Sequence, residues 1–289
     1  MGSASPGTAG SARLGIVAGG GPLPGHVIAA CRQSGRPFFV FALEGFADPA
    51  VIGEAPHAWV RLGAFGPAWE ILCEQQIGEL VMIGPVNRPP LRKMGLDAFT
   101  ARKIASIGLA AMRNMGDDGL LRAVIRLAEE EGFRVIGVDE ILDGLLAEEG
   151  TCGSIAPDAD ALADIARGMS VARAIGRLDV GQAVVVQEGI VLGVEVIEGT
   201  DALLERCAAL GRDGPGGVLV KMRKPGQERR IDLPTIGATT VAGAARAGLR
   251  GIAVEAGGTL IVDREAAVAA ADKAGLFVIG VVPAEGDGG

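Results

Sequence analysis

The chain has 289 residues, of which 49% are hydrophobic, and this is enough for about two domains with cores of their own. The formal net charge is −8, so the chain as a whole has no basic field for nucleic acid, and DNA and RNA are not expected partners. The apolar segments are interrupted by Gly, Arg or Asp before they reach the ~18 residues that span a bilayer, so no transmembrane segment is expected.

The four cysteines lie far apart and form no C-x-x-C pair, which argues against zinc ribbons and a disulfide framework. Only two histidines and no tyrosine are present, so carboxylates are better candidate metal ligands, and oxygen ligands select Mg²⁺ or Mn²⁺. Residues 1–12 lack the charged start and apolar segment of a signal peptide and are expected to form a loose tail. We therefore expect a cytoplasmic protein with reduced thiols.

In the first half, short apolar strands alternate with helices. Strands are predicted at 14–18, 38–43, 80–83 and 133–138, and helices at 23–33, 67–76 and 120–131. Apolar strands separated by helices indicate a parallel sheet that is covered on both faces. The sequence therefore predicts an α/β fold with a first domain over residues 13–148.

The second half is less regular and begins with a predicted helix at 159–177. Two strands, 183–187 and 190–196, flank the turn Glu188-Gly189 and indicate a hairpin, hence a mixed sheet. Further strands are predicted at 218–221, in a strand-turn-strand over 251–262 and at 276–282, and further helices at 203–210, 240–247 and 264–274. Residues 149–289 are therefore predicted to form a second α/β domain.

Two loops of the first domain carry candidate ligand-binding residues. Gly19, Gly20 and Gly21 follow the first strand and could hold a phosphate with their backbone amides, although a tight strand-to-helix turn explains them equally well. Prolines break the dinucleotide fingerprint here, but Glu44 lies where an acidic residue would hold a ribose, so a nicotinamide-dependent oxidoreductase remains an alternative. Arg88 follows the third strand, where a guanidinium suits a phosphate or carboxylate.

The second domain carries the denser set of charges. Lys221 ends an apolar strand, and the segment 224–234 has charges of both signs between two prolines. Cations for phosphates beside acids for a metal are what pyrophosphate chemistry needs. A module that binds a nucleotide sugar without cleaving it is the non-enzymatic alternative. In the first domain, Asp117 and Asp118 are expected to cap a helix rather than to form a metal pair.

Several motifs together resemble a known family, the LpxI type of UDP-2,3-diacylglucosamine pyrophosphatase, which acts in lipid A biosynthesis in Gram-negative bacteria. The most specific are V-E-x-I-E-G-T-D over 194–201 and K-P-x-Q over 224–227, and further matching segments are 15–24, 86–89, 116–118, 178–187 and 227–234. Glu228 stands where the family usually has Asp, and this shifts the assignment of a catalytic carboxylate to Asp232.

The resemblance implies hydrolysis of UDP-2,3-diacylglucosamine to UMP and 2,3-diacylglucosamine 1-phosphate, known as lipid X, by attack of water on the β-phosphorus with Mg²⁺ or Mn²⁺. It also implies a Rossmann-like N-terminal domain and a C-terminal catalytic domain. The acyl chains are expected in an apolar groove between the domains, near Arg88 and the Gly189 hairpin. A homodimer and peripheral contact with the inner membrane are further expectations.

The resemblance also suggests roles for individual residues. The catalytic residues would be Asp232, Asp201 and Lys221, and Asp232, Asp201 and Glu195 would hold the metal or orient water. Lys221, Lys224 and Arg230 would neutralise the diphosphate. The substrate-binding set comprises Gly19, Gly20, Gly21, Arg88, Gln187, Thr200, Lys224, Gln227 and Arg230.

Overall fold

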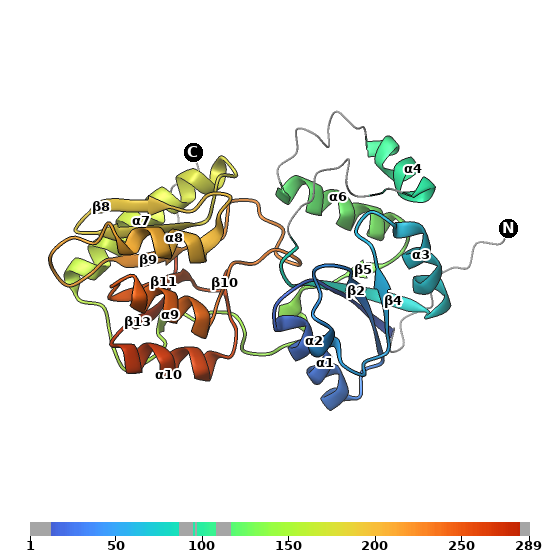
Figure 1. Cartoon of the computed structure of the whole chain (residues 1–289), viewed down its shortest axis with the longest axis horizontal. Helices are drawn as coiled ribbons and strands as arrows, with labels where there is room; N and C mark the ends of the chain where they lie inside the picture. Colours follow the sequence, from blue (N-terminus) through green and yellow to red (C-terminus); the bar gives the residue numbers. More distant parts are fainter. Residues whose placement is uncertain (1–12, 87–94, 96, 108–116, 284–289) are drawn as a thin grey trace. The chain divides into compact units, whose positions relative to one another are not determined.

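The structure is a computed structural model that describes residues 13–86, 95, 97–107 and 117–283. It divides into two compact units (Figure 1). The N-terminal unit comprises Met1–Asp143 together with Glu228–Asp232, and the C-terminal unit comprises Gly144–Gln227 and Leu233–Gly289. The division between Asp143 and Gly144 lies a few residues before the predicted boundary, and the predicted tail at 1–12 lies outside the described residues.

The described part of the N-terminal unit forms a five-stranded parallel sheet with the Rossmann-like order β3-β2-β1-β4-β5. Its strands are β1 (Arg13–Ala18), β2 (Phe38–Leu43), β3 (His57–Val60), β4 (Ile77–Ile83) and β5 (Arg134–Val135). Its helices are α1 (Leu23–Ser34), α2 (Pro49–Ile52), α3 (Phe65–Glu74), α4 (Ala98–Ile107), α6 (Asp117–Glu130) and the short 3₁₀ helix η2 (Val138–Glu140). The predicted parallel α/β fold is confirmed.

The two faces of this sheet are covered by different helices. Phe39 and Phe41 of β2 and Leu80 of β4 point to one face and pack with Ala68 of α3 and Ile125 of α6. Figure 1 places α1 and α2 on the other side of the sheet. The apolar runs of the sequence therefore fold as strands that are buried on both faces.

The described part of the C-terminal unit forms a six-stranded mixed sheet with the order β6-β13-β11-β9-β7-β8, and a two-stranded sheet of β10 and β12. The strands are β6 (Gly150–Thr151), β7 (Ala183–Gln187), β8 (Ile190–Val194), β9 (Val218–Lys221), β10 (Thr235–Ile236), β11 (Gly251–Glu255), β12 (Leu260–Ile261) and β13 (Phe277–Val281). The helices are α7 (Ala159–Arg177), α8 (Gly199–Ala208), α9 (Ala238–Arg246) and α10 (Arg264–Ala274). The predicted mixed sheet is confirmed.

Alternation along β7 divides the core of this unit into two layers. Ala183 and Val185 belong to the core cluster that α8, α9 and α10 cover, whereas Val184 and Val186 belong to the cluster that α7 covers. A Cβ atom on Gly168 would lie 2.4 Å from Cγ2 of Val220, so glycine lets α7 approach the sheet closely.

The predicted β7–β8 hairpin is present, and a helix fixes its turn. Glu188 and Gly189 have positive φ angles of 52° and 73°, as in a type I′ turn. Oδ2 of the buried Asp164 on α7 accepts a hydrogen bond from the Glu188 amide at 3.1 Å, and Oδ1 accepts one from the Gly189 amide at 2.7 Å. Asp164 therefore ties the hairpin to α7.

Several elements differ from the prediction. β3 was not among the predicted strands, because its residues alternate between exposed and buried and lack a long apolar run. β5 is shorter than the predicted strand at 133–138, and α8 begins at Gly199 rather than near Leu203. Asp117 is the first residue of α6, so Asp117 and Asp118 lie inside the helix rather than before it.

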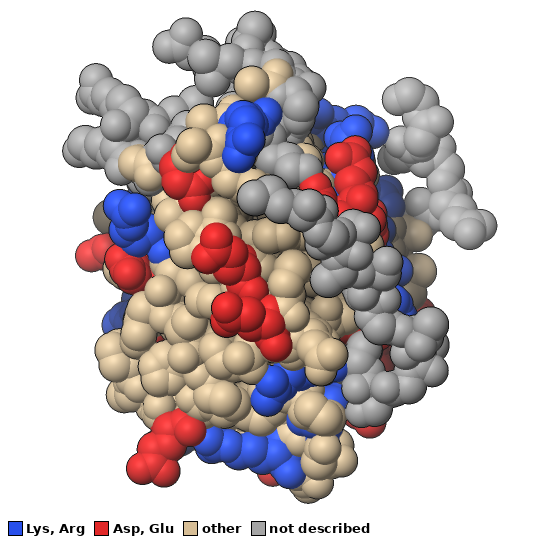
Figure 2. All heavy atoms as spheres, turned by 90° about the vertical axis from the view of Figure 1, so that its right-hand side faces the viewer, with Lys and Arg blue, Asp and Glu red and all other residues tan. Residues whose placement is uncertain are grey.

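Two features expected from the composition can be compared with the structure: the charge on its surface and the apolar character of its helices. On the face in Figure 2, Lys and Arg side chains lie mixed with Asp and Glu among the coloured residues, so this part of the surface carries both signs of charge. Among the described residues, no helix combines the length and apolar character needed to cross a membrane.

Candidate functional site

The candidate site of the C-terminal unit lies at one edge of the mixed sheet. Lys221 is the last residue of β9, and Glu195 follows β8 directly. Both strands run antiparallel to β7, so they run parallel to each other and end at the same edge. Thr200 lies in the first turn of α8, which starts just beyond Glu195. The sequence pattern at 194–201 therefore places a strand end and a helix start beside Lys221.

A hydrogen-bond chain joins these three residues. The Lys221 Nζ atom donates to Thr200 Oγ1 at 3.0 Å and to the Thr235 carbonyl oxygen at 2.9 Å. Thr200 Oγ1 donates to Glu195 Oε1 at 2.6 Å, and Glu195 Oε2 accepts from the Gln182 amide at 3.1 Å. We call Lys221, Thr200 and Glu195 the buried network.

Burial makes this network expensive to disturb. Lys221 is 7% exposed and Glu195 is 6% exposed. Charged side chains are rarely buried to this extent unless they are paired and hydrogen-bonded. The ammonium and the carboxylate meet this condition through the Thr200 hydroxyl, so the network holds a cationic group in a fixed place at the sheet edge.

Asp201 lies next to the buried network on the first turn of α8, and its side chain is exposed. Glu198 precedes this helix and pairs with Arg206 at 2.7 Å, and the hydrogen bond from Arg206 holds the pKa of Glu198 below its usual range. Asp201 therefore offers a solvent-facing carboxylate beside Thr200, as a ligand or a water-orienting group requires.

The K-P-x-Q motif forms a tight turn. The Gln227 amide donates to the Lys224 carbonyl oxygen at 3.0 Å, and Gly226 between them has a φ of 75°, as in a type II turn with Pro225 at its second position. The Gln227 Oε1 atom accepts from the Lys224 amide at 2.9 Å, and the Lys224 Nζ atom lies 2.7 Å from Asp179 Oδ1. The buried Gln227 side chain thus shapes the turn that presents Lys224.

Gln187, another predicted substrate-binding residue, also makes structural contacts. Its Nε2 atom donates to the Arg212 carbonyl oxygen at 2.9 Å, and its Oε1 atom accepts from the Arg212 amide at 3.0 Å. Gln187 is 1% exposed. Both ends of its amide therefore hold the loop after α8.

The segment Glu228–Asp232 belongs to the N-terminal unit, and we call it the strap. Ile231 of the strap packs against the core cluster of that unit. The Arg230 guanidinium donates from Nε to Glu228 Oε1 at 2.9 Å, from Nη2 to Glu228 Oε2 at 3.0 Å and from Nη1 to Glu129 Oε1 at 2.5 Å. The bidentate pair with Glu228 therefore braces the strap internally, and the bond to Glu129 ties the strap to α6.

Charge stabilises this clamp further. The hydrogen bonds from Arg230 hold the pKa of the Glu228 carboxyl below its usual range, and those to Glu228 hold the pKa of Arg230 above its usual range. Glu228 thus uses both its oxygens on Arg230. Every nitrogen of the Arg230 guanidinium donates a hydrogen bond, and the bond from Nη1 joins the strap to Glu129 of α6.

Asp232 is the last residue of the strap and is half-buried. Its amide donates to the Glu228 carbonyl oxygen at 3.1 Å, so the strap closes as a helical turn that carries Asp232. The predicted catalytic residues are therefore divided: Asp232 belongs to the N-terminal unit, and Asp201 and Lys221 belong to the C-terminal unit.

The glycine loop of the N-terminal unit packs against a second loop. The Gly19 amide donates to the Ile83 carbonyl oxygen at 2.8 Å, and the Gly20 amide donates to the Pro85 carbonyl oxygen at 3.0 Å. A Cβ atom on Gly19 would lie 2.5 Å from the Gly84 carbonyl oxygen. Close packing of two loops thus requires glycine here, and two of the amides proposed for a phosphate are engaged with backbone. Gly21 has a φ of 74°.

The remaining predictions concern Arg88 and the metal. Arg88 lies outside the described residues, and the groove expected between the domains stays a prediction. Among the side chains that the structure describes, no group of three His, Cys, Asp or Glu residues could hold a metal ion. Both carboxylate oxygens of Glu195 already accept hydrogen bonds, so Asp201 and Asp232 suit a metal better than Glu195 does.

Sequence reasoning missed two carboxylates of the C-terminal unit. The sequence pattern places Asp164 in the helix at 159–177, and a single Asp on an amphipathic helix gives no signal for its contact with a distant turn. Glu255 ends β11, and its Oε2 atom accepts from the Arg223 amide at 3.1 Å. Its place at the end of a buried strand, next to β9, could have marked it as a residue of the same sheet edge.

Comparisons with known proteins agree with this architecture. The family model described as the LpxI N-terminal domain matches residues 13–145, and that described as the LpxI C-terminal domain matches residues 148–279. The chain is 45% identical over 279 residues to UDP-2,3-diacylglucosamine pyrophosphatase LpxI of Caulobacter vibrioides, with 94% of this chain and 99% of the relative covered. The chain therefore belongs to the LpxI family.

Proposed function

We propose that the chain hydrolyses UDP-2,3-diacylglucosamine to UMP and 2,3-diacylglucosamine 1-phosphate. The similarity to a relative named for this activity carries the proposal, because it extends over both units at 45% identity. The buried network supports it, since a fixed cationic group beside a helix N-terminus suits a substrate with two phosphates.

In the proposed reaction, water attacks phosphorus and the bridging oxygen leaves. The water oxygen forms a bond to phosphorus, the bond from that phosphorus to the bridging oxygen breaks, and the proton released by water passes to the Asp232 carboxylate and then to solvent. Lys221 and Lys224 counter the negative charge of the diphosphate. Arg230 holds the strap that carries Asp232, and its guanidinium is the third cation proposed to face the diphosphate.

We further propose a divalent cation, Mg²⁺ or Mn²⁺, as the cofactor. Mg²⁺ in phosphate sites commonly takes one or two carboxylates and completes its shell with substrate oxygens and water, so a cluster of three protein ligands is not required. The carboxylate of Asp232 in the N-terminal unit and that of Asp201 in the C-terminal unit each fit this donor chemistry on their own. When bound, the cation would neutralise charge on the pyrophosphate and lower the pKa of a nearby water.

The lipid substrate implies where the protein works. Because both acyl chains of UDP-2,3-diacylglucosamine favour a bilayer, we propose peripheral contact with the cytoplasmic side of the inner membrane. We propose separately that the chain forms a homodimer, and size-exclusion chromatography with light scattering tests this.

The test is release of UMP from UDP-2,3-diacylglucosamine, followed by chromatography with and without Mg²⁺. We expect release that EDTA abolishes and that excess Mg²⁺ or Mn²⁺ restores. Failure to release UMP with either metal would contradict the function. Full activity after exhaustive chelation would leave the function intact and contradict the cofactor.

A further inference from the structure

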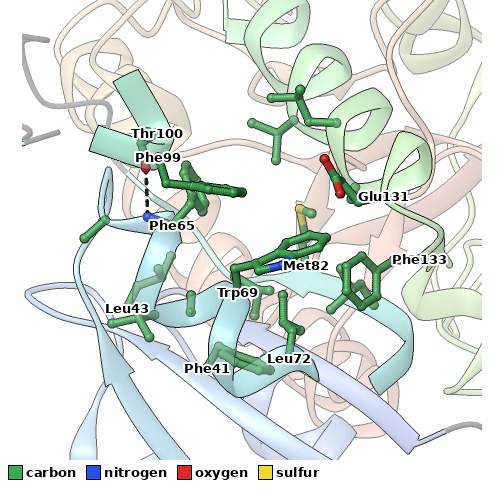
Figure 3. Close-up of a pocket in the computed structure, with 18 of the residues that line it drawn as sticks. Phe41, Leu43, Phe65, Trp69, Leu72, Met82, Phe99, Thr100, Glu131 and Phe133 are labelled. Atoms are coloured by element: carbon green, nitrogen blue, oxygen red, sulfur yellow. Dashed lines mark hydrogen bonds between the residues drawn. The ribbon is translucent and has the colours of Figure 1, made fainter. Parts of the chain in front are cut away.

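An apolar pocket of about 130 Å³ lies within the N-terminal unit, over the sheet face that α3 and α6 cover (Figure 3). This is many times the roughly 10–15 Å³ that one water molecule needs. Its lining is almost entirely aliphatic or aromatic. Trp69 of α3 lies in the middle of the view, with Phe99 of α4 and Phe133 on two sides of it.

Aromatic contacts shape one wall of the pocket. The Trp69 ring stacks on Phe99 with centroids 5.8 Å apart and meets the edge of Phe133 at 5.2 Å. The Thr100 hydroxyl accepts a hydrogen bond from the Phe65 amide at 2.9 Å, so this polar group of the lining is engaged with backbone. A pocket with such a lining holds water poorly and favours an apolar ligand.

The strand residues of the lining place the pocket near the carboxyl ends of the sheet. Phe41 of β2, Val17 of β1 and Met82 of β4 lie side by side in the sheet, each one or two residues before its strand ends. Open α/β sheets bind ligands at this end. The loop after Val17 is the glycine loop, so a chain in the pocket would leave a head group near the loops at the sheet's end.

The charged members of the lining lie toward solvent. Arg61 is exposed, and Glu131 is partly exposed. The pocket therefore combines an apolar interior with a polar rim, which matches a ligand that has an apolar tail and a polar head.

We propose that this pocket binds one acyl chain of the diacylated nucleotide sugar. The inference rests on the proposed function, because that substrate brings two acyl chains that must leave water when it binds. It differs from the groove expected between the domains, since every lining residue belongs to the N-terminal unit.

Tryptophan fluorescence tests the proposal directly. The chain has two tryptophans, and Trp59 is not part of the lining. A Trp59→Phe variant therefore reports Trp69 alone, and a Trp69→Phe variant reports Trp59 alone. The probe is UDP-2,3-diacylglucosamine with brominated acyl chains, because bromine quenches tryptophan only at short range.

We expect the probe to quench most of the fluorescence of Trp59→Phe and little of that of Trp69→Phe. Release of UMP by the wild type without quenching of Trp69 would overturn the pocket and leave the function standing. Quenching of Trp69 without release of UMP would support the pocket and contradict the function. Equal quenching of both variants would overturn the pocket.

A matched pair of substitutions adds a kinetic test. Ala68 of α3 lines the pocket, whereas Ala105 of α4 is exposed and does not line it. Ala68→Leu fills space that a long acyl chain would use, so we expect kcat/KM to fall about tenfold for a long-chain substrate and little for a short-chain analogue. Ala105→Leu should leave both values unchanged. An equal loss for both substrates of Ala68→Leu would overturn the proposal.

Discussion

The buried network and the strap each carry predicted catalytic residues, and they are built in opposite ways. The network lies inside the C-terminal unit. The end of β9 fixes Lys221, the end of β8 fixes Glu195, and the first turn of α8 fixes Thr200. The strap has no strand or long helix of its own, and the ion pair of Arg230 with Glu129 and the packing of Ile231 attach it to the rest of the N-terminal unit.

This difference separates two ways of positioning a functional group. Regular structure and burial hold Lys221, so its position depends on the core of one unit. Asp232 depends on a surface clamp between a short segment and α6, formed by residues about a hundred positions apart in the chain. Damage to the network should therefore reduce both stability and activity, whereas damage to the strap should reduce mainly activity.

Among the substitutions that test the network against the strap, replacement of Lys221 should reduce kcat/KM the most. Lys221→Met removes the buried ammonium, and we expect kcat/KM for UDP-2,3-diacylglucosamine to fall about a hundredfold or more. The matched control is Lys273→Met, since Lys273 is exposed in the last turn of α10. Near-normal turnover by Lys221→Met would remove Lys221 from the site.

Thr200 tests the network through stability. Thr200→Val removes the hydroxyl that accepts from Lys221 and donates to Glu195, so two buried charges lose a partner. We expect a loss of about 1–3 kcal/mol in the free energy of unfolding, and Thr200→Ser should restore most of it. Denaturant unfolding measures both values. An unchanged stability of Thr200→Val would mean that the hydroxyl contributes little.

Arg230 tests the strap through catalysis. Lysine is a point charge and cannot form the bidentate pair, so Arg230→Lys should loosen the strap and lower kcat about tenfold with little change in Tm. Arg134→Lys is the control, because Arg134 also bridges two glutamates, Glu79 and Glu140, in the same unit. A rise in KM alone would instead indicate that Arg230 binds substrate.

The smallest effect is the pH dependence of the clamp. The pKa of Glu228 is depressed in the folded chain, so its stabilising contribution is present above the unfolded value of about 4.3 and is lost as the pH falls through the folded value. Glu228→Gln should therefore lower the free energy of unfolding at pH 7 by at most about 1 kcal/mol, which thermal unfolding detects as a lower Tm. The gap between wild type and variant should narrow as the pH falls below the unfolded value of about 4.3, and a gap that stays constant with pH would contradict the account.

The sequence patterns predicted the network better than the strap. Lys221 and Glu195 follow apolar strands, and the common edge at which such strands end brings these residues together. Asp232 lies only eight residues after Lys224 in the sequence, and the pattern places both in one charged segment between two prolines. The structure instead assigns the strap to the other unit, because Ile231 and Arg230 pair with residues far away in the chain.

The sequence patterns also do not predict which polar side chains hydrogen-bond to other parts of the fold. Gln187 and Gln227 have the amide groups that bind sugars and phosphates, and in the structure Gln187 also holds the Arg212 backbone and Gln227 also accepts from the Lys224 amide. Asp164 supports a turn more than twenty residues away. Such contacts depend on how helices and loops pack, which periodicity and motif spacing do not contain.

The most direct test follows binding and cleavage in one sample of Asp232→Asn with UDP-2,3-diacylglucosamine and Mg²⁺. Calorimetry measures binding, and mass spectrometry of the recovered ligand measures cleavage. We predict affinity close to that of the wild type and a bound substrate that stays intact, because the variant keeps the fold and loses the carboxylate. UMP released at the wild-type rate, with only a lowered Tm, would contradict the catalytic assignment of Asp232 and leave it as a residue that stabilises the strap.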